Sequence, residues 1–541
     1  MNTSKKALLA AALGIAMAGA AVTMAGAQDD SSALFSDAPA AAVAPAVGAP
    51  AAAAPAEAGF ALGLAGSHEF GYRFPAYSAS TSNYDGEMKS PYFSNELDLG
   101  VQDKDIKLVS NWSLALRPLS VDASGEHGAW DELTRARPLE NYLSWNPSGL
   151  KLAVGYQIFS WGVADKKNPT DNLNPRDYTV GVNADKVPVL AADAVWYPSD
   201  AVSVEGVFLP TAQKSLYPVD FEGMADAGAR ALTAQFSAAL VSVYGGMGYT
   251  GYSYGSTTIV APDNGPGNAI AGGKLNYKSS AFDASISYLY DLDPLYTPVL
   301  SVAKNGLGLP TSVSVSLERE RIHRFGFDAK TTIGKFGLWT EAAYSLTRND
   351  GSSDDYAYRR SKIDYVVGTD FNFGPNDAGY VNVQYIGTWI PGYDDTFYED
   401  LLAGKITDTA VVYQRALAES LGLDTEGLLQ GATINLKYEI ADATFTPQLT
   451  AVAALPFGYD KKNALNQDVV RCCSLALNPE LDVKPVDSFH IKLGADLAYA
   501  WTKVGGGAAK LDTATDKIGI YTSSNNVYLK ILYKWNYDLK K

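Results

Sequence analysis

Cysteine and histidine are scarce in this chain. Its 541 residues include two cysteines, Cys472 and Cys473, and four histidines. Two neighbouring cysteines cannot supply the four ligands of a structural zinc site, and adjacent cysteines rarely bridge each other. We interpret the pair as incidental, within a polar loop predicted at residues 456–486. The sequence therefore predicts no metal and no cofactor.

Charge is also limited. Charged residues make up 19% of the chain, below the usual quarter, and acidic residues outnumber basic ones by 59 to 43. Because a surface that binds nucleic acid must be basic, this balance excludes nucleic acid as a partner. It does not fix the ion preference of a pore, which depends on the charges at the narrowest point.

Long apolar runs are absent after residue 27, so no membrane-spanning helix is predicted there. Residues 1–27 have the features of a secretory signal peptide, since Lys5 and Lys6 precede an apolar stretch and small residues follow at 25–27. A retained anchor is the alternative, but the stretch is shorter than about 20 residues. We expect residues 28–59, rich in alanine and proline, to form a periplasmic leader, and residues 60–541 to form the folded domain.

What the chain has in abundance is alternation of apolar and polar residues. Near its end, every second side chain is apolar or aromatic: Val527, Leu529, Ile531, Tyr533, Trp535 and Tyr537. Successive side chains of a strand point to opposite faces, so this pattern predicts a strand with one apolar face. Its three terminal aromatic residues suit a water–lipid boundary. The same pattern recurs throughout residues 60–541.

The connections between these segments alternate in length. Short polar turns are predicted at 102–105, 146–149, 198–200, 278–281, 334–335, 374–379 and 440–443. Long polar stretches lie between them, at 75–90, 118–137, 160–188, 211–228, 291–320, 390–428 and 456–486. This predicts an all-β fold: a transmembrane up-and-down antiparallel β-barrel of about 16–18 strands, with short periplasmic turns and long extracellular loops.

A soluble β-sandwich or a solenoid would also use alternating strands. The sequence shows no fixed repeat of the length that solenoids use. Aromatic residues gather at strand ends, and the polar faces carry many full charges, which a barrel can enclose around water. Closure also removes the edges that so large a sheet would expose. These features favour the barrel.

One segment, residues 155–178, differs from the rest. It contains two Asn-Pro-x-Asp units, at 168–171 and 174–177. Proline disfavours helix at the residue before it, and Asn and Asp side chains bond nearby backbone amides, so we expect an ordered loop. Such a loop after a barrel strand either braces neighbouring strands or folds inward and narrows the lumen. The candidate residues are Trp161, Gly162, Asn168, Asp171, Asn174, Arg176 and Asp177.

The same segment resembles a signature of bacterial outer-membrane barrels of the alginate-export-like, capsule-assembly-like and related porin-like kinds. The matching residues are Gly155, Gln157, Trp161, Gly162, Asn168, Pro169, Asp171, Leu173, Asn174, Pro175, Asp177 and Tyr178. The resemblance implies the barrel class and leaves the substrate open. The chain departs from it at the C-terminus, since such barrels often end on an aromatic residue and this one runs on from Tyr537 to Lys541.

Charged residues of both signs fall on the predicted polar faces. The main candidates for lumen charges are Arg324, Asp328, Lys330, Asp364, Asp370, Lys437 and Glu439, and the same alternation places Glu205 and Glu341 inside. These groups either pair across neighbouring strands or form rings that steer solutes. The spacing of Asp165, Asp171 and Asp177 raises calcium as an alternative, but the segment lacks the dense, glycine-containing oxygen loop of such sites.

Signs of catalysis are weak. Ser488 and His490 share one face of a predicted strand, but residues at that spacing are about 7 Å apart, too far for direct proton transfer. No nucleophile elbow, phosphate loop or zinc-protease motif is present. We therefore expect that the protein is not an enzyme.

Together these features predict a porin-like channel in the bacterial outer membrane, which lets small solutes pass passively or selectively through a polar lumen. A channel for hydrophobic substrates, similar to fatty-acid porins, and a surface adhesin or structural barrel are the alternatives. The expected partners are outer-membrane lipid, small solutes and the barrel-assembly machinery, and a homo-oligomer is left open.

Overall fold

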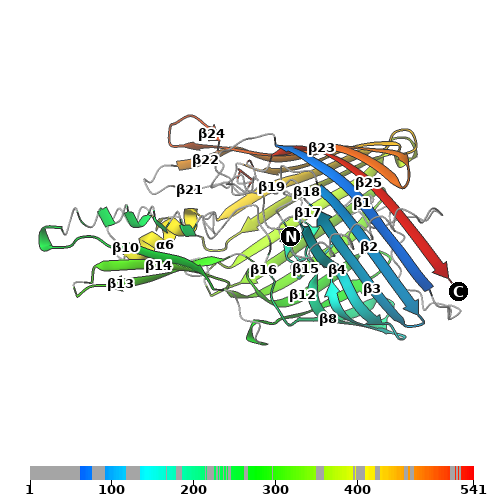
Figure 1. Ribbon diagram of the computed structural model, residues 1–541, viewed down its shortest axis with the longest axis horizontal. Coiled ribbons are helices and arrows are strands. Elements are labelled where there is room, and N and C mark those ends of the chain that lie inside the picture. The colour runs from blue at the N-terminus through cyan, green and yellow to red at the C-terminus, as the bar shows by residue number, and fades with distance from the viewer. Residues whose placement is uncertain are drawn as a thin grey trace, which may run out of the picture.

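The alternating segments form one antiparallel sheet that closes on itself (Figure 1). The computed structural model describes residues 61–75, 92–116, 134–165, 167–177, 185–213, 215, 225–226, 229–230, 232–234, 237–238, 241, 245–260, 266–294, 296–306, 308–348, 359–393, 396–397, 409–420, 427–455, 461–462, 468–511, 518–519, 522 and 525–540. The predicted signal peptide at 1–27 and leader at 28–59 lie outside these residues.

The main sheet contains 20 strands, of which β21 (Lys461–Lys462) and β24 (Lys510–Leu511) are two-residue additions, so 18 strands form the wall. They are β1 (Ala61–Pro75), β2 (Tyr92–Asp103), β3 (Ile106–Leu116), β4 (Thr134–Trp145), β5 (Leu150–Gln157), β8 (Val189–Ser199), β9 (Val202–Leu209), β11 (Ile270–Lys278), β12 (Asp283–Leu292), β15 (Arg321–Ile333), β16 (Phe336–Leu346), β17 (Lys362–Phe373), β18 (Gly379–Trp389), β19 (Leu428–Tyr438), β20 (Phe445–Ala454), β22 (Asp468–Val486), β23 (Phe489–Val504) and β25 (Asn526–Lys540).

The first and last wall strands close the barrel. β1 pairs with β25 along its whole length, from Ala61 opposite Lys540 to Pro75 opposite Asn526. Closure pairs the two edges that an open sheet would leave exposed. The predicted fold class is confirmed, with a strand number at the top of the predicted range.

The two rims differ as predicted. Hairpins join β2 to β3, β4 to β5, β8 to β9, β11 to β12, β15 to β16, β17 to β18 and β19 to β20 at one rim, where the short turns were expected. Gly334, with φ of 62°, forms a two-residue turn with Lys335, a conformation that glycine adopts without strain. The strand ends that the longer connections join lie at the opposite rim.

Polarity is inverted relative to a soluble protein. Ile286 on the outer face of β12 is 57% exposed, whereas its neighbour Ser285 on the inner face is 5% exposed. Aromatic rings contact one another in a chain through Phe336, Phe371, Phe373 and Tyr438 near the short turns. A second group, Tyr288, Tyr290, His323 and Phe325, lies toward the long-loop rim.

Two predicted loops were wrong in part. Most of 456–486 belongs to β22, so Cys472 and Cys473 lie in a strand rather than in a polar loop. We predicted a loop because several residues of this strand that point inward are polar, such as Asn478 and Glu480. Residues 291–320 likewise contain β13 (Thr297–Lys304) and β14 (Pro310–Glu318), which form a hairpin.

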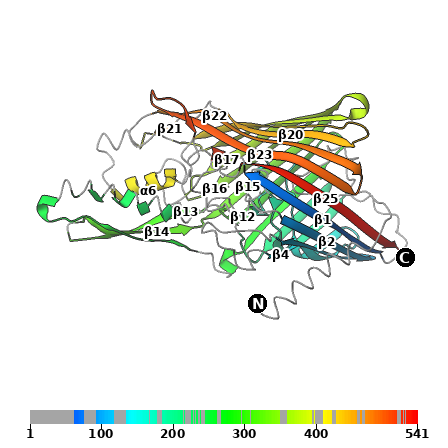
Figure 2. The same cartoon turned by 45° about the horizontal axis from the view of Figure 1, so that its top comes forward.

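That hairpin belongs to a module beyond the long-loop rim, seen at the left of Figures 1 and 2. β10 (Ser253–Ile259) pairs with β14 in parallel, and α6 (Thr409–Ser420) covers the sheet. Three connections thus share one apolar core, which includes Ala229, Val315 and Leu417. The smaller elements are β6 (Arg176–Asp177), β7 (Asp185–Lys186), η2 (Gly245–Met247), η3 (Pro266–Asn268) and η4 (Pro375–Asp377). Among the ranges given above, no helix is both long enough and apolar enough to cross a membrane.

Candidate constriction site

The segment singled out in the sequence leaves β5 and lies against the inner faces of β9, β12, β15, β16 and β17. We call its residues 158–177 the inward loop. Its contacts reach Glu205 on β9, the β12–β15–β16 region around Arg324, and Asp364 on β17. The loop therefore lies inside the barrel and leans on wall strands that are distant from it in the chain.

Glu341 of β16 holds the loop. Its carboxylate accepts short hydrogen bonds from the backbone N–H groups of Val163 and Ala164. It also accepts bonds from the Thr170 N–H at 3.4 Å and from the Thr170 hydroxyl at 3.0 Å. The residue is 0% exposed. Four donors on one buried carboxylate anchor the loop to the wall, because hydrogen bonds to an ionised acceptor are the stronger kind.

Gly162 makes this close approach available. Its φ is 88°, a region that side chains with a Cβ rarely adopt. A Cβ placed there would meet the Asn168 and Thr170 side chains inside van der Waals contact, and would lie 2.6 Å from Glu341 Oε1. The glycine therefore lets the loop pass next to the carboxylate.

The two Asn-Pro units fix the loop's turns. Asn168 donates from Nδ2 to the Trp161 carbonyl at 2.9 Å and accepts at Oδ1 from the Asp171 N–H at 3.1 Å. Asn174 donates to the Gln157 and Val187 carbonyls, both at 3.0 Å, and accepts from the Phe159 N–H at 2.7 Å. Each asparagine side chain thus bonds backbone groups of the segment, next to a proline that has no N–H to donate.

Asp171 of the loop pairs with two cations that are near it in the chain. Asp171 Oδ2 lies 3.1 Å from Arg176 Nη2 and 2.6 Å from Lys186 Nζ. Asp177 belongs to β6, whose backbone pairs with that of β7, and it is opposite Asp185 in the register of the two strands. In the part of the chain that the structure describes, no group of three or more His, Cys, Asp or Glu residues is placed to hold a metal ion.

An apolar anchor completes the attachment. Trp161 is 3% exposed and packs with Phe159 and Leu173 of the loop against an apolar patch of the inner wall. The wall residues of that patch are Val189, Ala191, Val207, Leu209, Ile270 and Leu289. The Trp161 indole N–H donates to Glu205 Oε1 at 2.9 Å. The wall is therefore apolar on its inner face where the loop covers it.

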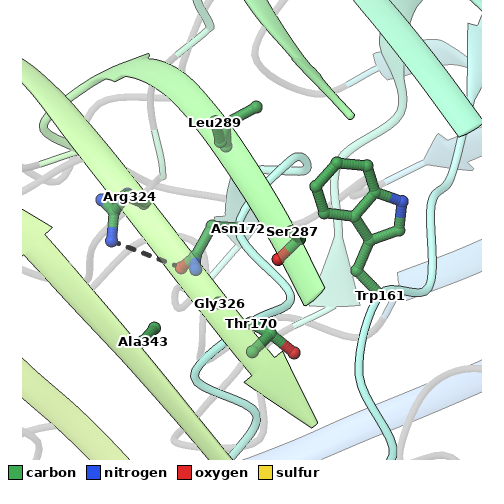
Figure 3. Close-up of a pocket in the computed structure, with 8 residues that line it drawn as sticks. All are labelled: Trp161, Thr170, Asn172, Ser287, Leu289, Arg324, Gly326 and Ala343. Carbon is green, nitrogen blue, oxygen red and sulfur yellow. Dashed lines mark hydrogen bonds between the residues drawn. The ribbon is translucent and has the colours of Figure 1, made fainter. Parts of the chain in front are cut away.

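A small pocket lies at the edge of this attachment (Figure 3). Its lining residues are Trp161, Thr170, Asn172, Ser287, Leu289, Arg324, Gly326 and Ala343. Arg324 Nη1 donates to Asn172 Oδ1 at 3.5 Å, and Arg324 Nε lies 3.1 Å from Asp291 Oδ2. A cationic side chain of the wall thus meets the polar side of the loop.

The predicted lumen charges are placed as follows. Arg324, Asp328 and Lys330 share the inner face of β15, and Asp364 and Asp370 share that of β17. Asp328 lies 3.7 Å from Lys274 Nζ, Asp364 lies 3.9 Å from Lys167 Nζ, and Asp370 accepts from the Tyr380 hydroxyl at 3.2 Å. Lys437 and Glu439 pair at 3.1 Å beside the turn after β19. Arg324 and the three aspartates thus each have a close polar partner. The field of Arg324 and Lys330 against Asp364 and Asp370 stays a prediction.

Sequence reasoning missed some members of this network. Asp291 was assigned to a loop, yet it continues the inward series of Ser285 and Ser287 on β12, which is a signal that could have found it. Lys274 alternates with the outward Leu275 and Tyr277 on β11, which is the same signal. Lys186 lies on the two-residue strand β7, which is too short to show alternation. The prediction that Ser488 and His490 share a strand was wrong, because Ser488 belongs to the turn before β23. His490 Nδ1 lies 3.0 Å from Asp482 Oδ2.

No family model and no curated protein matches this chain. Among solved structures it is similar to Pseudomonas aeruginosa OpdK with vanillate, at a TM-score of 0.45 and 7% identity over 88% of this chain and 99% of that one. It is similar to Pseudomonas aeruginosa OccK9 (OpdG) at a TM-score of 0.42 and 9% identity, over 89% of this chain and 99% of that one. It is similar to the outer membrane channel DcaP of Acinetobacter baumannii at a TM-score of 0.35 and 11% identity, over 88% of this chain and 96% of that one.

Proposed function

We propose that this chain is an outer-membrane channel through which small polar solutes pass, and that the inward loop sets the width of its passage. The outer face of the wall carries large exposed apolar residues, and the inner face carries charged and amide side chains. A closed barrel of this polarity fits a bilayer outside and water inside.

The dimensions agree with this placement. Eight residues separate Phe282, near the short turns, from Tyr290, near the other rim. At about 3.3 Å per residue and a tilt of about 40°, that spacing corresponds to roughly 20 Å along the barrel axis, close to the height of a membrane barrel's apolar band. The aromatic groups at the two levels then lie at the two water–lipid boundaries.

The observation that carries the proposal is the attachment of the inward loop at Glu341. A loop that only covered the mouth would not need an anchor on the inner face of β16. Here four donors of the loop converge on a carboxylate 0% exposed within the wall. The loop is therefore held inside the lumen, where it narrows the passage and presents polar groups such as Asn172 and Lys167 to solutes.

Reconstitution into a planar bilayer tests the proposal. We expect stepwise currents of uniform size from the full chain, and faster swelling of liposomes that contain it when small sugars are supplied. A barrel that shows the heat-dependent gel migration of a folded barrel, yet carries no current and admits no sugar, would contradict it. The same preparations should be tested with long-chain fatty acids, since their selective uptake would favour the hydrophobic-substrate alternative.

The apolar patch inside the barrel does not favour that alternative. Its wall residues are covered by Trp161, Phe159 and Leu173 of the loop itself. A pocket for an acyl chain would need that surface to be open. The polar passage is thus the function that the described lumen supports best.

The module beyond the rim supports a second candidate, a surface-binding role. β10, β13, β14 and α6 share a core of their own, which a plain pore would not require. Deleting residues 294–320 with a short replacement turn separates the two roles. Loss of cell or matrix binding with unchanged conductance would assign the module to adhesion.

The finer resemblance, to alginate-export-like and capsule-assembly-like barrels, remains part of the proposal. It is supported by the ordered geometry of the matching residues Trp161, Gly162, Asn168 and Asn174. We also propose that the barrel is inserted by the barrel-assembly machinery and that it performs no chemical step. The signal peptide and periplasmic leader are proposed from sequence, and a homo-oligomer stays open.

A further inference from the structure

Cys472 and Cys473 lie where the pairing of β22 with β23 slips by one residue. Arg471 is opposite Thr502 and Cys473 is opposite Trp501, so Cys472 is the extra residue between two paired positions. This is the arrangement of a β-bulge, in which two residues of one strand oppose a single residue of its partner. Cys472 and Cys473 together oppose Trp501.

The bulge brings both thiols to the outer face of the barrel. Arg471 and Ser474, which flank the pair, are 1% and 2% exposed, whereas both cysteines are exposed and free. Trp501 opposite them is 37% exposed on the outer side. In a regular strand, adjacent side chains point to opposite faces, so one thiol would lie inside the barrel. The slip in register therefore creates a pair that the sequence alone does not predict.

The pair lies near the upper edge of the apolar band. β23 starts at Phe489, at the short-turn rim, and Trp501 lies 12 residues further along this strand. At about 3.3 Å per residue and a tilt of about 40°, this places the pair roughly 30 Å from that rim, compared with a band about 25 Å tall. Water-soluble species can thus reach the thiols from the side of the long loops.

Adjacent cysteines in an extended strand are poorly placed for an ordinary disulfide. Consecutive Cα atoms lie about 3.8 Å apart, whereas disulfides usually span about 4.4–6.8 Å between Cα atoms. Two sulfurs on one face can instead share a larger, soft atom, because thiolates prefer soft centres. Zinc would need two more ligands, but a centre of low coordination number would not.

We propose that Cys472 and Cys473 form a vicinal-dithiol site that binds a soft, thiophilic centre such as trivalent arsenic from outside the barrel. Binding to an arsenoxide is a condensation. Two S–H bonds break, two S–As bonds form, and the oxygen of the arsenoxide leaves with both protons as water. Arsenic keeps its oxidation state and no oxidant is consumed. The site is independent of the proposed passage of solutes.

Phenylarsine oxide added to the full chain in detergent tests the site. Intact-mass measurement should show one phenylarsine per chain and no thiol left for a maleimide. A dithiol should release it, whereas a monothiol at the same concentration should not. C472S and C473S should each weaken retention by a factor of about 10²–10⁴, since the second bond is then no longer intramolecular.

Two control variants keep two cysteines but change the relative position of their thiols. In C472S/S474C the pair is still adjacent, but it lies past the bulge and points to opposite faces. In C472S/L475C both thiols are on the outer face but about 7 Å apart. Each should retain phenylarsine no better than the single variants, with the heat-dependent gel migration of the wild type as the check on folding. Equal retention by either control, two arsenicals per chain, or a wild type without free thiols would overturn the proposal.

Discussion

Glu341 on β16 accepts two hydrogen bonds from Thr170, one from its N–H at 3.4 Å and one from its hydroxyl at 3.0 Å, although 171 residues separate the two in the chain. The pair links the inward loop to the wall. Glu341→Ala removes every acceptor of this anchor and should cost about 2–3 kcal/mol of loop attachment. We expect the unit conductance to rise by a factor of about two, with noisier open levels. Single-channel recording measures both.

Glu341→Gln is the matched variant, because it keeps the shape and one carbonyl acceptor but loses the charge. It should fall between the wild type and Glu341→Ala. Asp98→Ala on β2, another inward carboxylate, should leave the current noise unchanged. An unchanged conductance in Glu341→Ala would show that the loop does not limit the passage.

Trp161 should matter through its packing more than through its hydrogen bond. Trp161→Phe keeps the ring among Phe159 and Leu173 but loses the bond to Glu205, which predicts a loss of about 1 kcal/mol. Trp161→Ala leaves a cavity in the attachment and should cost about 3–5 kcal/mol. Proteolysis at residues 158–177 in detergent reports both effects, and similar rates for the two variants would contradict this order.

Asn174 holds three backbone groups at once, so its loss should release the start of the loop. Asn174→Ala leaves the Gln157 and Val187 carbonyls and the Phe159 N–H without this partner, at a cost of about 2–4 kcal/mol. Faster amide exchange at Phe159 is the expected result. Asn276→Ala, at an inward asparagine that contacts Ser203 on the wall, is the control and should leave that amide unchanged.

The module beyond the rim should respond to acid through Asp226. Hydrogen bonds from Arg230 Nε, at 2.7 Å, and from the Tyr254 hydroxyl hold the pKa of Asp226 below its ordinary value of 3.8. Burial, followed by the bond to Asp226, raises the pKa of Tyr254 to about 12, so the tyrosine stays a donor. A carboxyl group whose pKa is lower in the folded than in the unfolded state stabilises the fold at pH values above its unfolded pKa. This stabilisation is lost as the pH falls through the folded pKa.

Amide exchange of β10 at about pH 5 and about pH 3, corrected for intrinsic rates, checks this sign. The protection of residues 253–259 should drop at the lower pH in the wild type. In the Asp226→Asn variant the protection of these amides should be low at both pH values. A wild type that is equally protected at both would show that the contact does not stabilise the module.

The sequence could predict the wall but not the attachments inside it. Alternation gave the strands, since each wall residue must face either lipid or lumen, and the hairpins followed from the turn residues. The Asn-Pro units predicted an ordered loop because their contacts are local. The anchor on Glu341 and the apolar patch around Leu289 join segments far apart in the chain, and no local pattern encodes which wall strand the loop meets. The bulge at Cys472 was missed because one extra residue shifts the alternation.

Lys151 and Val154 on β5 offer the most direct test that the outer face meets lipid and the inner face meets water. Their exposed fractions on the bare barrel are comparable, 39% for the Lys151 side chain and 56% for Val154, but the two point to opposite faces. Each is replaced by cysteine in the C472S/C473S background, reconstituted in liposomes and treated with a small, charged thiol reagent. Rapid labelling at 151 and none at 154 is the predicted result, and equal labelling at both positions would contradict it.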